Sequence, residues 1–285
     1  MNPAARVIAS LLVSLSLLSG CGDEPSTACN GLDELCERTY DQVVYATTHN
    51  AFNASDEGFK LANQTHGVRR QLEDGVRGLM LDIYDEGDDV LVYHGVLSDF
   101  LGYARLADVL AEIADFLRRQ PREVVTIIFE TYASPESTRR AFEESGAIDY
   151  VYVHEEGATY PTLAEMIERN ERLVVFTDRD GGAYDWYLPV WDHARETPYA
   201  AGKPEELECL GGRGPEEAPL LIFNHFLTQI SGSPSLAEMI NYDPYLGDRI
   251  EECEEALGQK VNFVTVDFYE IGDTLAVTRR LNTSR

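Results

Sequence analysis

Short apolar segments that alternate with amphipathic helical patterns constrain the fold of this chain more than any other feature of its sequence. Residues 124–129, Leu173–Thr177 and Leu220–Asn224 are apolar at successive positions, which is typical of parallel strands buried on both faces. Leu106–Arg119 instead repeats its apolar residues at helical spacing. This alternation predicts a parallel sheet covered by helices. Because no G-x-G-x-x-G motif follows the first strand, an α/β fold of the TIM-type (β/α)8 barrel kind, irregular or incomplete, is favoured over an open Rossmann sheet.

The remaining elements follow from the same patterns. We expect further strands over residues 43–46, 79–83, 90–93 and 261–268. We expect further helices over residues 66–74, 134–145, 162–170, 235–240, 245–257 and 273–281. An aromatic stretch is predicted to be a loop, whose rings either pack in the core or dip into a membrane interface. These rings are Tyr184, Trp186, Tyr187 and Trp191.

The first residues of the chain have the features of an export signal. Residues 7–18 form an apolar run that is too short to span a bilayer. The string Leu18-Ser19-Gly20-Cys21 then resembles a bacterial lipobox, in which the chain is cut before a lipidated cysteine; a plain small-residue cleavage site is the alternative. We expect a signal peptide (1–20), a tether (21–27) and one barrel domain (28–285). The protein would be exported and anchored through Cys21 to a membrane, facing the periplasm or the cell exterior.

Four cysteines follow Cys21, and an exported chain can oxidise them. The spacings suggest that Cys29 pairs with Cys36 and that Cys209 pairs with Cys253. Four cysteines allow three pairings, and the sequence does not choose rigorously among them. A zinc site is the weaker alternative, because no C-x-x-C or H-x-x-x-H spacing accompanies these residues.

The charge of the chain excludes one class of partner. The net charge is −27, and no basic stripe offsets it, so we expect no nucleic-acid binding. The same charge repels anionic lipid head groups at long range. A site that binds phosphate on this chain must therefore create its own positive field from a metal, an arginine or protonated histidines. We expect a monomer.

Polar residues gather at the predicted carboxyl ends of three strands, where barrel enzymes carry their active sites. They are His49 and Asn50 on the first strand, Asp82 and Tyr84 on the second with His94 shortly after it, and Glu130 on the third. Histidine titrates near neutrality and can serve as a general acid or a general base. Oxygen ligands from Asn, Asp and Glu suit calcium or magnesium. These residue types suit phosphodiester cleavage, which needs a base for the nucleophile, an acid for the leaving alkoxide and a cation for the developing negative charge.

Three sequence blocks point to a known family. The first is residues 46–51 (Ala-Thr-Thr-His-Asn-Ala). The second is residues 71–82 (Gln-Leu-Glu-Asp-Gly-Val-Arg-Gly-Leu-Met-Leu-Asp), followed by Val92-Tyr93-His94-Gly95. The third is residues 122–130 (Arg-Glu-Val-Val-Thr-Ile-Ile-Phe-Glu). Together they resemble the X-domain of phosphatidylinositol phospholipase C, densely over residues 43–177 and more loosely beyond. The resemblance implies a barrel phosphodiesterase that acts on an inositol phospholipid or a related lipid.

The resemblance also implies roles for single residues. His49 matches the general base and His94 matches the general acid, and a substrate hydroxyl would attack first to give a cyclic phosphate. An aspartate orients the first histidine in some members, and Asp267 on the last strand is the candidate for that role here. The metal-ligand positions of the calcium-dependent members are matched by Asn50, Asp82 and Glu130.

Two positions depart from the family pattern. Met80 stands where the calcium-dependent members carry an acidic residue, two positions before Asp82. Tyr84 stands where the metal-independent bacterial members carry an arginine. We therefore expect a calcium ion, with magnesium second, held by three ligands in a weakened site. Tyr84 would line the phosphate pocket as a neutral hydrogen-bond donor.

Further candidates for substrate binding have structural alternatives. Arg179 follows the strand at residues 173–177 and either contacts a head group or forms a surface ion pair. His225 ends another strand and either faces the same rim or packs inside. The alternatives to the leading function are a related barrel phosphodiesterase for glycerophosphodiesters or sphingolipids, and a surface lipoprotein that binds head groups without turnover.

Overall fold

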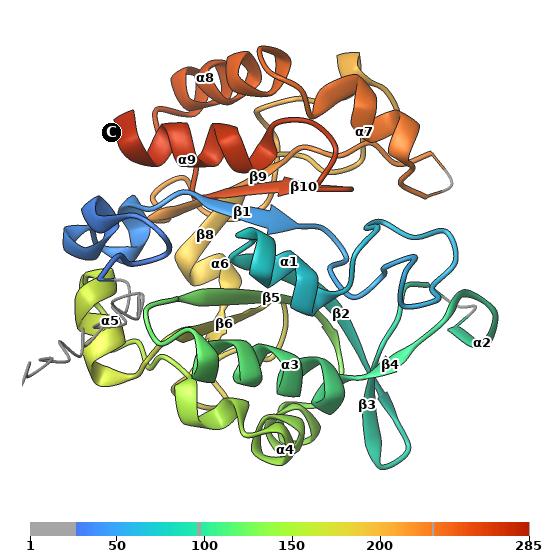
Figure 1. Ribbon diagram of the computed structural model, residues 1–285, viewed down its shortest axis with the longest axis vertical. Coiled ribbons are helices and arrows are strands. Elements are labelled where there is room, and N and C mark those ends of the chain that lie inside the picture. Colours follow the sequence, from blue (N-terminus) through green and yellow to red (C-terminus); the bar gives the residue numbers. More distant parts are fainter. Residues whose placement is uncertain (1–26, 96–97, 230, 285) are drawn as a thin grey trace, which may run out of the picture.

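The computed structural model describes residues 27–95, 98–229 and 231–284 (Figure 1). The predicted signal peptide, the lipidation site Cys21 and nearly all of the predicted tether lie outside these residues. Within them, no helix has both the length and the apolar character that a membrane crossing requires.

Eight parallel strands form one curled sheet with the TIM-type pattern. The strands pair in the order β7-β6-β5-β2-β1-β10-β9-β8. They are β1 (Tyr45–Thr48), β2 (Gly78–Glu86), β5 (Val125–Tyr132), β6 (Leu173–Thr177), β7 (Tyr187–Pro189), β8 (Ala194–Glu196), β9 (Leu220–Asn224) and β10 (Phe263–Val266). In the described part of the chain no pairing joins β7 to β8, so the barrel is open along that seam. The predicted fold class, an irregular or incomplete barrel, is confirmed.

Two short strands extend the sheet beside β2. These strands, β3 (Asp89–Val92) and β4 (Ala104–Arg105), pair in antiparallel fashion, β3 with β2 and β4 with β3. The hairpin formed by β2 and β3 projects from the barrel (Figure 1). His94 follows β3 in the sequence.

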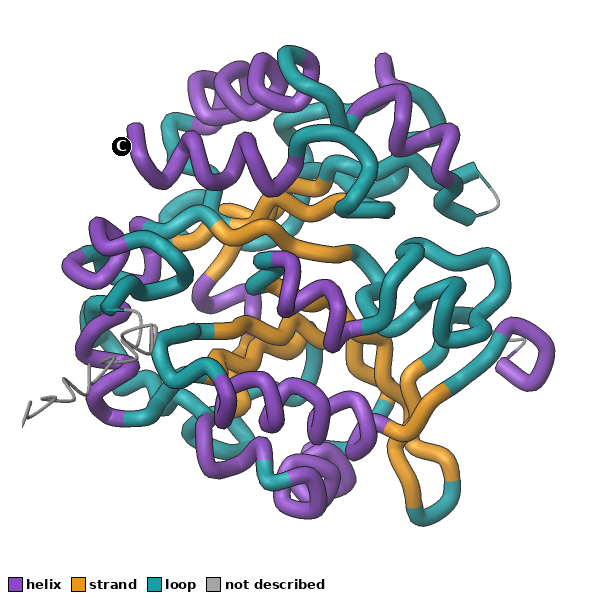
Figure 2. Tube along the Cα trace, viewed as in Figure 1, coloured by secondary structure: helices purple, strands orange, loops and turns teal. Residues whose placement is uncertain are grey.

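Helices surround the strands (Figure 2). They are α1 (Val68–Asp74), α2 (Ser98–Leu101), α3 (Leu106–Arg119), α4 (Pro135–Ser145), α5 (Leu163–Arg169), α6 (Val190–His193), α7 (Pro234–Ile240), α8 (Tyr245–Leu257) and α9 (Thr274–Ser284), with 3-10 turns η1 (Asp33–Glu37), η2 (Tyr40–Gln42), η3 (Ala147–Tyr150) and η4 (Pro204–Glu206). In Figure 1, α8 and α9 lie beside β9, β10 and β1, while α3 and α4 lie beyond β5 on the opposite side. The carboxyl ends of β1 and β10 point toward the side that holds α2 and α7.

Side-chain alternation along the strands divides the apolar residues into two cores. On β2, Leu79, Leu81 and Ile83 belong to the core between the sheet and the helices. Met80 packs against the other core, which fills the barrel interior and contains Phe176 and Phe263. Successive residues of a strand point to opposite faces, so Asp82 lies on the interior side, in line with Met80. Near the carboxyl end of a strand, the residues that face the interior therefore lie at the mouth of the barrel.

Local rules explain where the predicted helices begin. The side chain of Thr162 accepts a hydrogen bond from the backbone N–H of Glu165, and Glu165 bonds back to Thr162, which forms a capping box before α5. Ser134 caps α4, whose first residue is Pro135. The predicted helices are all present, with boundaries that match or shift by one to three residues.

The predicted loop in the aromatic stretch is wrong, because this segment contains β7, α6 and β8. Trp186 and Tyr187 are buried in the core between the sheet and the helices, so core packing is the correct alternative for these two rings. Trp191 is half-buried and lies on α6. The first and last predicted strands, at 43–46 and 261–268, are confirmed as elements, but β1 is shifted by two residues and β10 is shorter.

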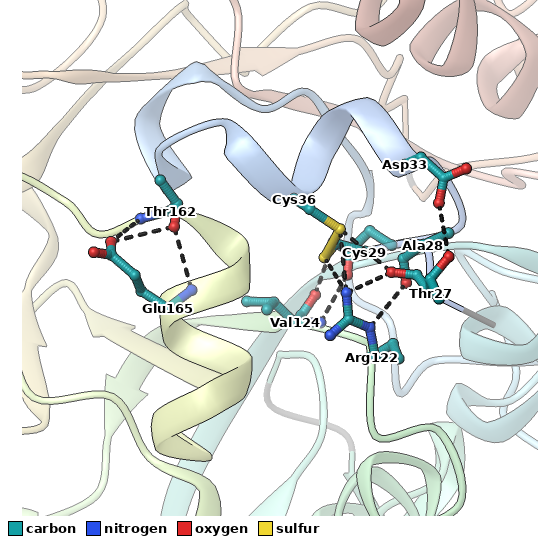
Figure 3. The surroundings of a disulfide bond; sticks show 10 residues. Thr27, Ala28, Cys29, Asp33, Cys36, Arg122, Val124, Thr162 and Glu165 are labelled. Atoms are coloured by element: carbon teal, nitrogen blue, oxygen red, sulfur yellow. Dashed lines mark hydrogen bonds between the residues drawn. A yellow bond between two sulfur atoms is a disulfide. The ribbon is translucent and has the colours of Figure 1, made fainter. Parts of the chain in front are cut away.

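Both predicted disulfides are confirmed. Cys29 is bonded to Cys36, and Cys209 is bonded to Cys253. Figure 3 shows the first bond beside Arg122, whose guanidinium donates to the carbonyls of Thr27 and Ala28. Arg122 precedes β5, so this contact ties the first described residues to the barrel. Disulfides of this kind are typical of exported proteins.

Candidate active site

A pocket at the carboxyl ends of the strands brings together four of the predicted site residues. His49, Asn50, Asp82 and Glu130 all line it. They come from the ends of β1, β2 and β5, strands that are neighbours in the sheet. The parallel register places Asp82 directly beside Glu130 on the paired strands. Met80 lies deeper on the same wall of the pocket.

His49 forms a hydrogen-bonded pair with Asp267. Its Nδ1 lies 2.9 Å from Oδ1 of Asp267, whose residue follows β10. The His49 ring stacks on Phe226, with ring centroids 3.9 Å apart and an angle of 5° between the planes. Because the Asp267 carboxylate accepts a hydrogen bond from Nδ1–H, the Nε2 atom carries the lone pair that can act as a base. The carboxylate and the aromatic ring together fix the orientation of the imidazole.

His94 forms the second histidine–carboxylate pair. Its Nδ1 lies 2.8 Å from Oδ2 of Asp82. This hydrogen bond and the charge of Asp82 raise the pKa of His94, although partial burial opposes the shift. The side chain of His94 is 58% exposed and that of Asp82 only 8%. A raised pKa favours the protonated imidazole near neutral pH, the form that can donate a proton.

Three oxygen-bearing side chains can hold a hard cation. Within the described residues, Oδ1 of Asn50 is buried and has no hydrogen-bond partner, which is uncommon for a buried amide oxygen. Glu130 accepts a hydrogen bond of 2.6 Å from the Tyr132 hydroxyl. Burial raises the pKa of Asp82, and the neighbouring charge of Glu130 adds to this shift. An unsatisfied amide oxygen beside two carboxylates fits calcium or magnesium chemically.

Arg213 is a residue of this pocket that sequence patterns did not reveal. Among the described residues that line the pocket it is the one arginine or lysine. Its guanidinium forms an ion pair with buried Glu196 and lies over the rings of Trp191 and Tyr199, at 4.5 Å and 4.8 Å from their centroids. Glu196 ends β8, and Arg213 lies on the long connection to β9. Nothing local marks Arg213 in the sequence, because its partners Glu196, Trp191 and Tyr199 all lie earlier in the chain and are brought to it by the fold.

Two predicted substrate residues lie in a stack beside the pocket. Tyr84 is sandwiched between Tyr93 and Tyr132, with ring centroids 4.0 Å and 4.6 Å away. Arg179 covers the other face of Tyr132 at 4.3 Å and forms an ion pair with Asp178 at 3.5 Å. Neither Tyr84 nor Arg179 lines the pocket. Arg179 therefore takes the position of a surface ion pair, and Tyr84 lies in the aromatic stack.

His225 is placed inside the protein and not at the rim. It is fully buried, its Nε2 lies 2.9 Å from the carbonyl of Ile240, and its Nδ1 lies 3.1 Å from Arg249. Burial and the charge of Arg249 lower the pKa of His225 to about 3, so the ring stays neutral. Packing explains His225 better than substrate contact, because the backbone and Arg249 satisfy both ring nitrogens.

A TIM-type barrel with two histidine–carboxylate pairs at its mouth defines a class of phospholipase C-like proteins. Residues 35–282 match the family model described as PI-PLC X 1, and the chain belongs to this family. A PI-PLC X domain-containing protein of Arabidopsis thaliana is 28% identical over 276 residues, which cover 89% of this chain and 63% of the relative.

Two further relatives extend the comparison. An uncharacterized secreted protein of Arthroderma benhamiae is 26% identical over 270 residues, covering 86% of this chain and 61% of that protein. This chain thus spans less than two thirds of the length of these two curated relatives. The solved phosphatidylinositol-specific phospholipase C from Listeria monocytogenes superposes with a TM-score of 0.59 at 16% identity, covering 86% of this chain and 95% of that one. This structural likeness supports the assignment of the TIM-type barrel fold.

Proposed function

We propose that this protein is a phospholipase C-like phosphodiesterase. The observation that carries the proposal is the pair of histidines at one barrel mouth, each bonded to a buried carboxylate: His49 to Asp267 and His94 to Asp82. One histidine is arranged to accept a proton and the other to donate one. Membership of the PI-PLC X family supports the same reaction class.

The proposed reaction uses the two histidines in sequence. Nε2 of His49 takes the proton of a hydroxyl adjacent to the phosphodiester, and that oxygen attacks phosphorus. The bond to the leaving alkoxide breaks, and His94 donates its proton to that oxygen. The products are a cyclic phosphodiester and an alcohol, and water can open the ring when the proton roles reverse. Asp267 keeps His49 in the tautomer that the first step needs.

The negative charge of the phosphate needs local compensation, because the pocket holds four carboxylates. We propose that Asn50, Asp82 and Glu130 hold calcium, or magnesium, with the affinity reduced by Met80. When bound, the cation would offset the charge on the phosphate oxygens. Arg213 is the side chain of the pocket that can supply further positive charge, and its stacking and its ion pair with Glu196 hold it in place.

We propose a lipid substrate, in keeping with the name of the Listeria relative. Apolar side chains are exposed near the barrel mouth: Leu61 is 52% exposed, Phe100 64% and Tyr103 55%. Lys60 lies over the ring of Phe100 at 4.3 Å, and its backbone N–H donates to the carbonyl of Leu101. Such a rim can contact a lipid surface while the pocket receives a head group.

The decisive experiment measures hydrolysis of phosphatidylinositol and of bis-p-nitrophenyl phosphate. We expect His49→Ala and His94→Ala each to lower the rate by about 10²–10⁴-fold, because each removes a proton-transfer group. His66→Ala is the matched control, since His66 also pairs with an aspartate, Asp56, but is exposed outside the pocket. Near wild-type turnover in either pocket variant would contradict the assigned roles. Head-group binding without turnover in the wild type would favour the binding-protein alternative.

We further propose that Cys21 carries a lipid anchor. The support is the sequence Leu18-Ser19-Gly20-Cys21, and the two disulfides agree with an exported chain. A secreted relative supports export. The anchor would hold a strongly acidic protein near a lipid surface that its net charge alone does not attract.

A further inference from the structure

Asn63 is a buried asparagine that lies between Asp267 and Asn50. Its Nδ2 donates to both carboxylate oxygens of Asp267, each at 3.1 Å. Its Oδ1 accepts hydrogen bonds from Nδ2 of Asn53 at 2.7 Å and from Nδ2 of Asn50 at 3.2 Å. The residue is only 4% exposed. One amide thus contacts the carboxylate that holds His49 and the asparagine that follows His49.

The surrounding atoms fix which way this amide points. If Asn63 were flipped, its oxygen would face the Asp267 carboxylate, and its NH₂ group would face the NH₂ groups of two other asparagines. Nδ2 of Asn63 also lies 3.5 Å from Nδ1 of His49. Both nitrogens are donors that converge on Oδ1 of Asp267, so this short separation reflects a shared acceptor.

Asp267 has few other sources of hydrogen bonds. Its side chain is buried, and within the described residues only His49 and Asn63 donate to it. Backbone closes the remaining side, because a Cβ on Gly232 would lie 2.1 Å from Oδ2 of Asp267. Asn63 is therefore the donor that holds Oδ2 while His49 bonds to Oδ1. A buried carboxylate that loses such a donor becomes free to rotate or to rebond.

We propose that Asn63 is a positioning residue: it holds the Asp267 carboxylate so that Asp267 keeps His49 in the base-competent tautomer. The inference rests on the proposed phosphodiesterase function. Asn63 touches no reacting atom and acts through Asp267.

The backbone around Asn63 is held independently of its side chain. Its N–H donates to the carbonyl of Asn53 at 3.0 Å, and its carbonyl accepts from the N–H of Phe268 at 2.8 Å. The next residue, Gln64, donates from Nε2 to the carbonyls of His49 and Val266. Substitution at position 63 should therefore leave the loop in place.

Two substitutions separate hydrogen bonding from packing. Asn63→Asp keeps the shape of the side chain but replaces the donor with a second carboxylate that repels Asp267. Asn63→Ala removes the side chain. We expect kcat to fall about 10–100-fold in the alanine variant and further in the aspartate variant, with KM within about twofold of wild type. If the Asn63→Asp variant were as active as wild type, the role of Asn63 would be packing alone, and the proposal would be overturned.

The matched control is Asn241→Ala. Asn241 is also a buried asparagine, and its Nδ2 donates to the backbone carbonyl of Asp267 at 2.9 Å without touching the carboxylate. We expect this variant to lose stability but to keep its kcat. A double-mutant cycle then tests the route of action: in an Asp267→Asn background, Asn63→Ala should change kcat less than about twofold, whereas additive losses would contradict action through Asp267.

A measurement without turnover separates this inference from the proposed function. Nitrogen-15 spectra of histidine, recorded where the imidazole is neutral, report which ring nitrogen carries the proton. We expect His49 to hold its proton on Nδ1 in the wild type and in Asn241→Ala, and to show both tautomers in Asn63→Ala. An unchanged tautomer in Asn63→Ala rejects the inference even if the enzyme is active. If no phosphodiester is cleaved, the proposed function fails, and the spectra alone decide the role of Asn63.

Discussion

Each carboxylate of the pocket needs a donor or a cation, because a buried negative charge is costly without one. Four carboxylates line the pocket, and three of them have a charged partner: Asp82 has His94, Glu196 has Arg213, and Asp178 has Arg179. Glu130 differs, because in the described part of the chain its hydrogen bond comes from the neutral hydroxyl of Tyr132. Glu130 is therefore the pocket carboxylate at which the proposed cation is best tested.

Replacing Glu130 tests the cation directly. We expect a chelator to lower wild-type activity and added calcium to restore it, and Glu130→Gln to need about tenfold more calcium because one ligand loses its charge. Calcium should also raise the melting temperature of the wild type more than that of Glu130→Gln. Glu143→Gln on α4, an exposed glutamate outside the pocket, is the control. Full activity in chelator would contradict the metal and leave Arg213 as the cation that faces the phosphate.

At the scale of elements, sequence patterns succeed where an apolar run is long and unbroken. The bounds of α3 and β6 agree with prediction because each has a continuous period or an uninterrupted apolar core. β8 is only three residues long and contains Arg195 and Glu196, which looks unlike a buried strand. These charges are buried because partners come from elsewhere in the chain, Gln259 for Arg195 and Arg213 for Glu196.

The same limit applies to the site. Motif blocks predicted His49, His94 and the neighbouring oxygen-bearing side chains, because those residues lie within a strand or one or two positions after it. Asn63 and Arg213 could not be predicted, since each lies in a connection between strands and gains its role from partners that no local motif marks. Arg213 pairs with Glu196 over a sequence separation of 17 residues. Asn63, for example, meets Asp267 over a sequence separation of 204 residues.

Helix α6 contains a histidine that should make stability depend on pH. Nδ1 of His193 lies 2.7 Å from the Tyr160 hydroxyl, and its ring meets that of His154 at 4.9 Å, with Asp192 beside it. Burial, with a contribution from His154, lowers the pKa of His193 to about 4. The unfolded chain takes up this proton near pH 6.5 and the folded chain only near pH 4, so stability is present above pH 6.5 and is lost as the pH falls through that window.

Replacing this histidine should flatten the acid side of the stability curve. In urea unfolding we expect wild type to lose more stability than His193→Gln between about pH 6.5 and pH 4, by about 2 kcal/mol after allowing for partial exposure. Parallel curves for wild type and His193→Gln would show that His193 titrates normally in the folded protein.

At the scale of the whole molecule, the acidic surface and the site have opposite electrostatic needs. The net charge of −27 keeps anionic surfaces away, while the pocket must attract a phosphate. The proposed cations of the pocket and the proposed anchor would reconcile the two, because an anchored enzyme does not need to be attracted from solution. The proposed anchor and the proposed pocket cations thus both explain how a strongly acidic protein could act on a phosphate.

Substituting the lipobox cysteine tests the anchor. We expect wild-type protein from a bacterial host to enter the detergent phase on Triton X-114 partitioning and Cys21→Ser to remain in the aqueous phase, because the thiol that carries the lipid is gone. Mass spectrometry of the mature N-terminus identifies the cut. A mature chain that begins at another residue and carries no lipid would contradict the lipobox.

The open seam between β7 and β8 has a consequence for how the molecule fluctuates. Strand pairs elsewhere in the barrel lock their amides in ladders on both sides, but β7 and β8 each have one paired neighbour in the described chain. Local opening should therefore begin here, where Val190 and Trp191 of α6 also line the pocket. Hydrogen–deuterium exchange should be fastest, among the barrel strands, in peptides that cover residues 187–196. A bound head-group analogue should slow that exchange. It would fill the pocket that α6 lines and so hold this loosely paired part of the barrel closed.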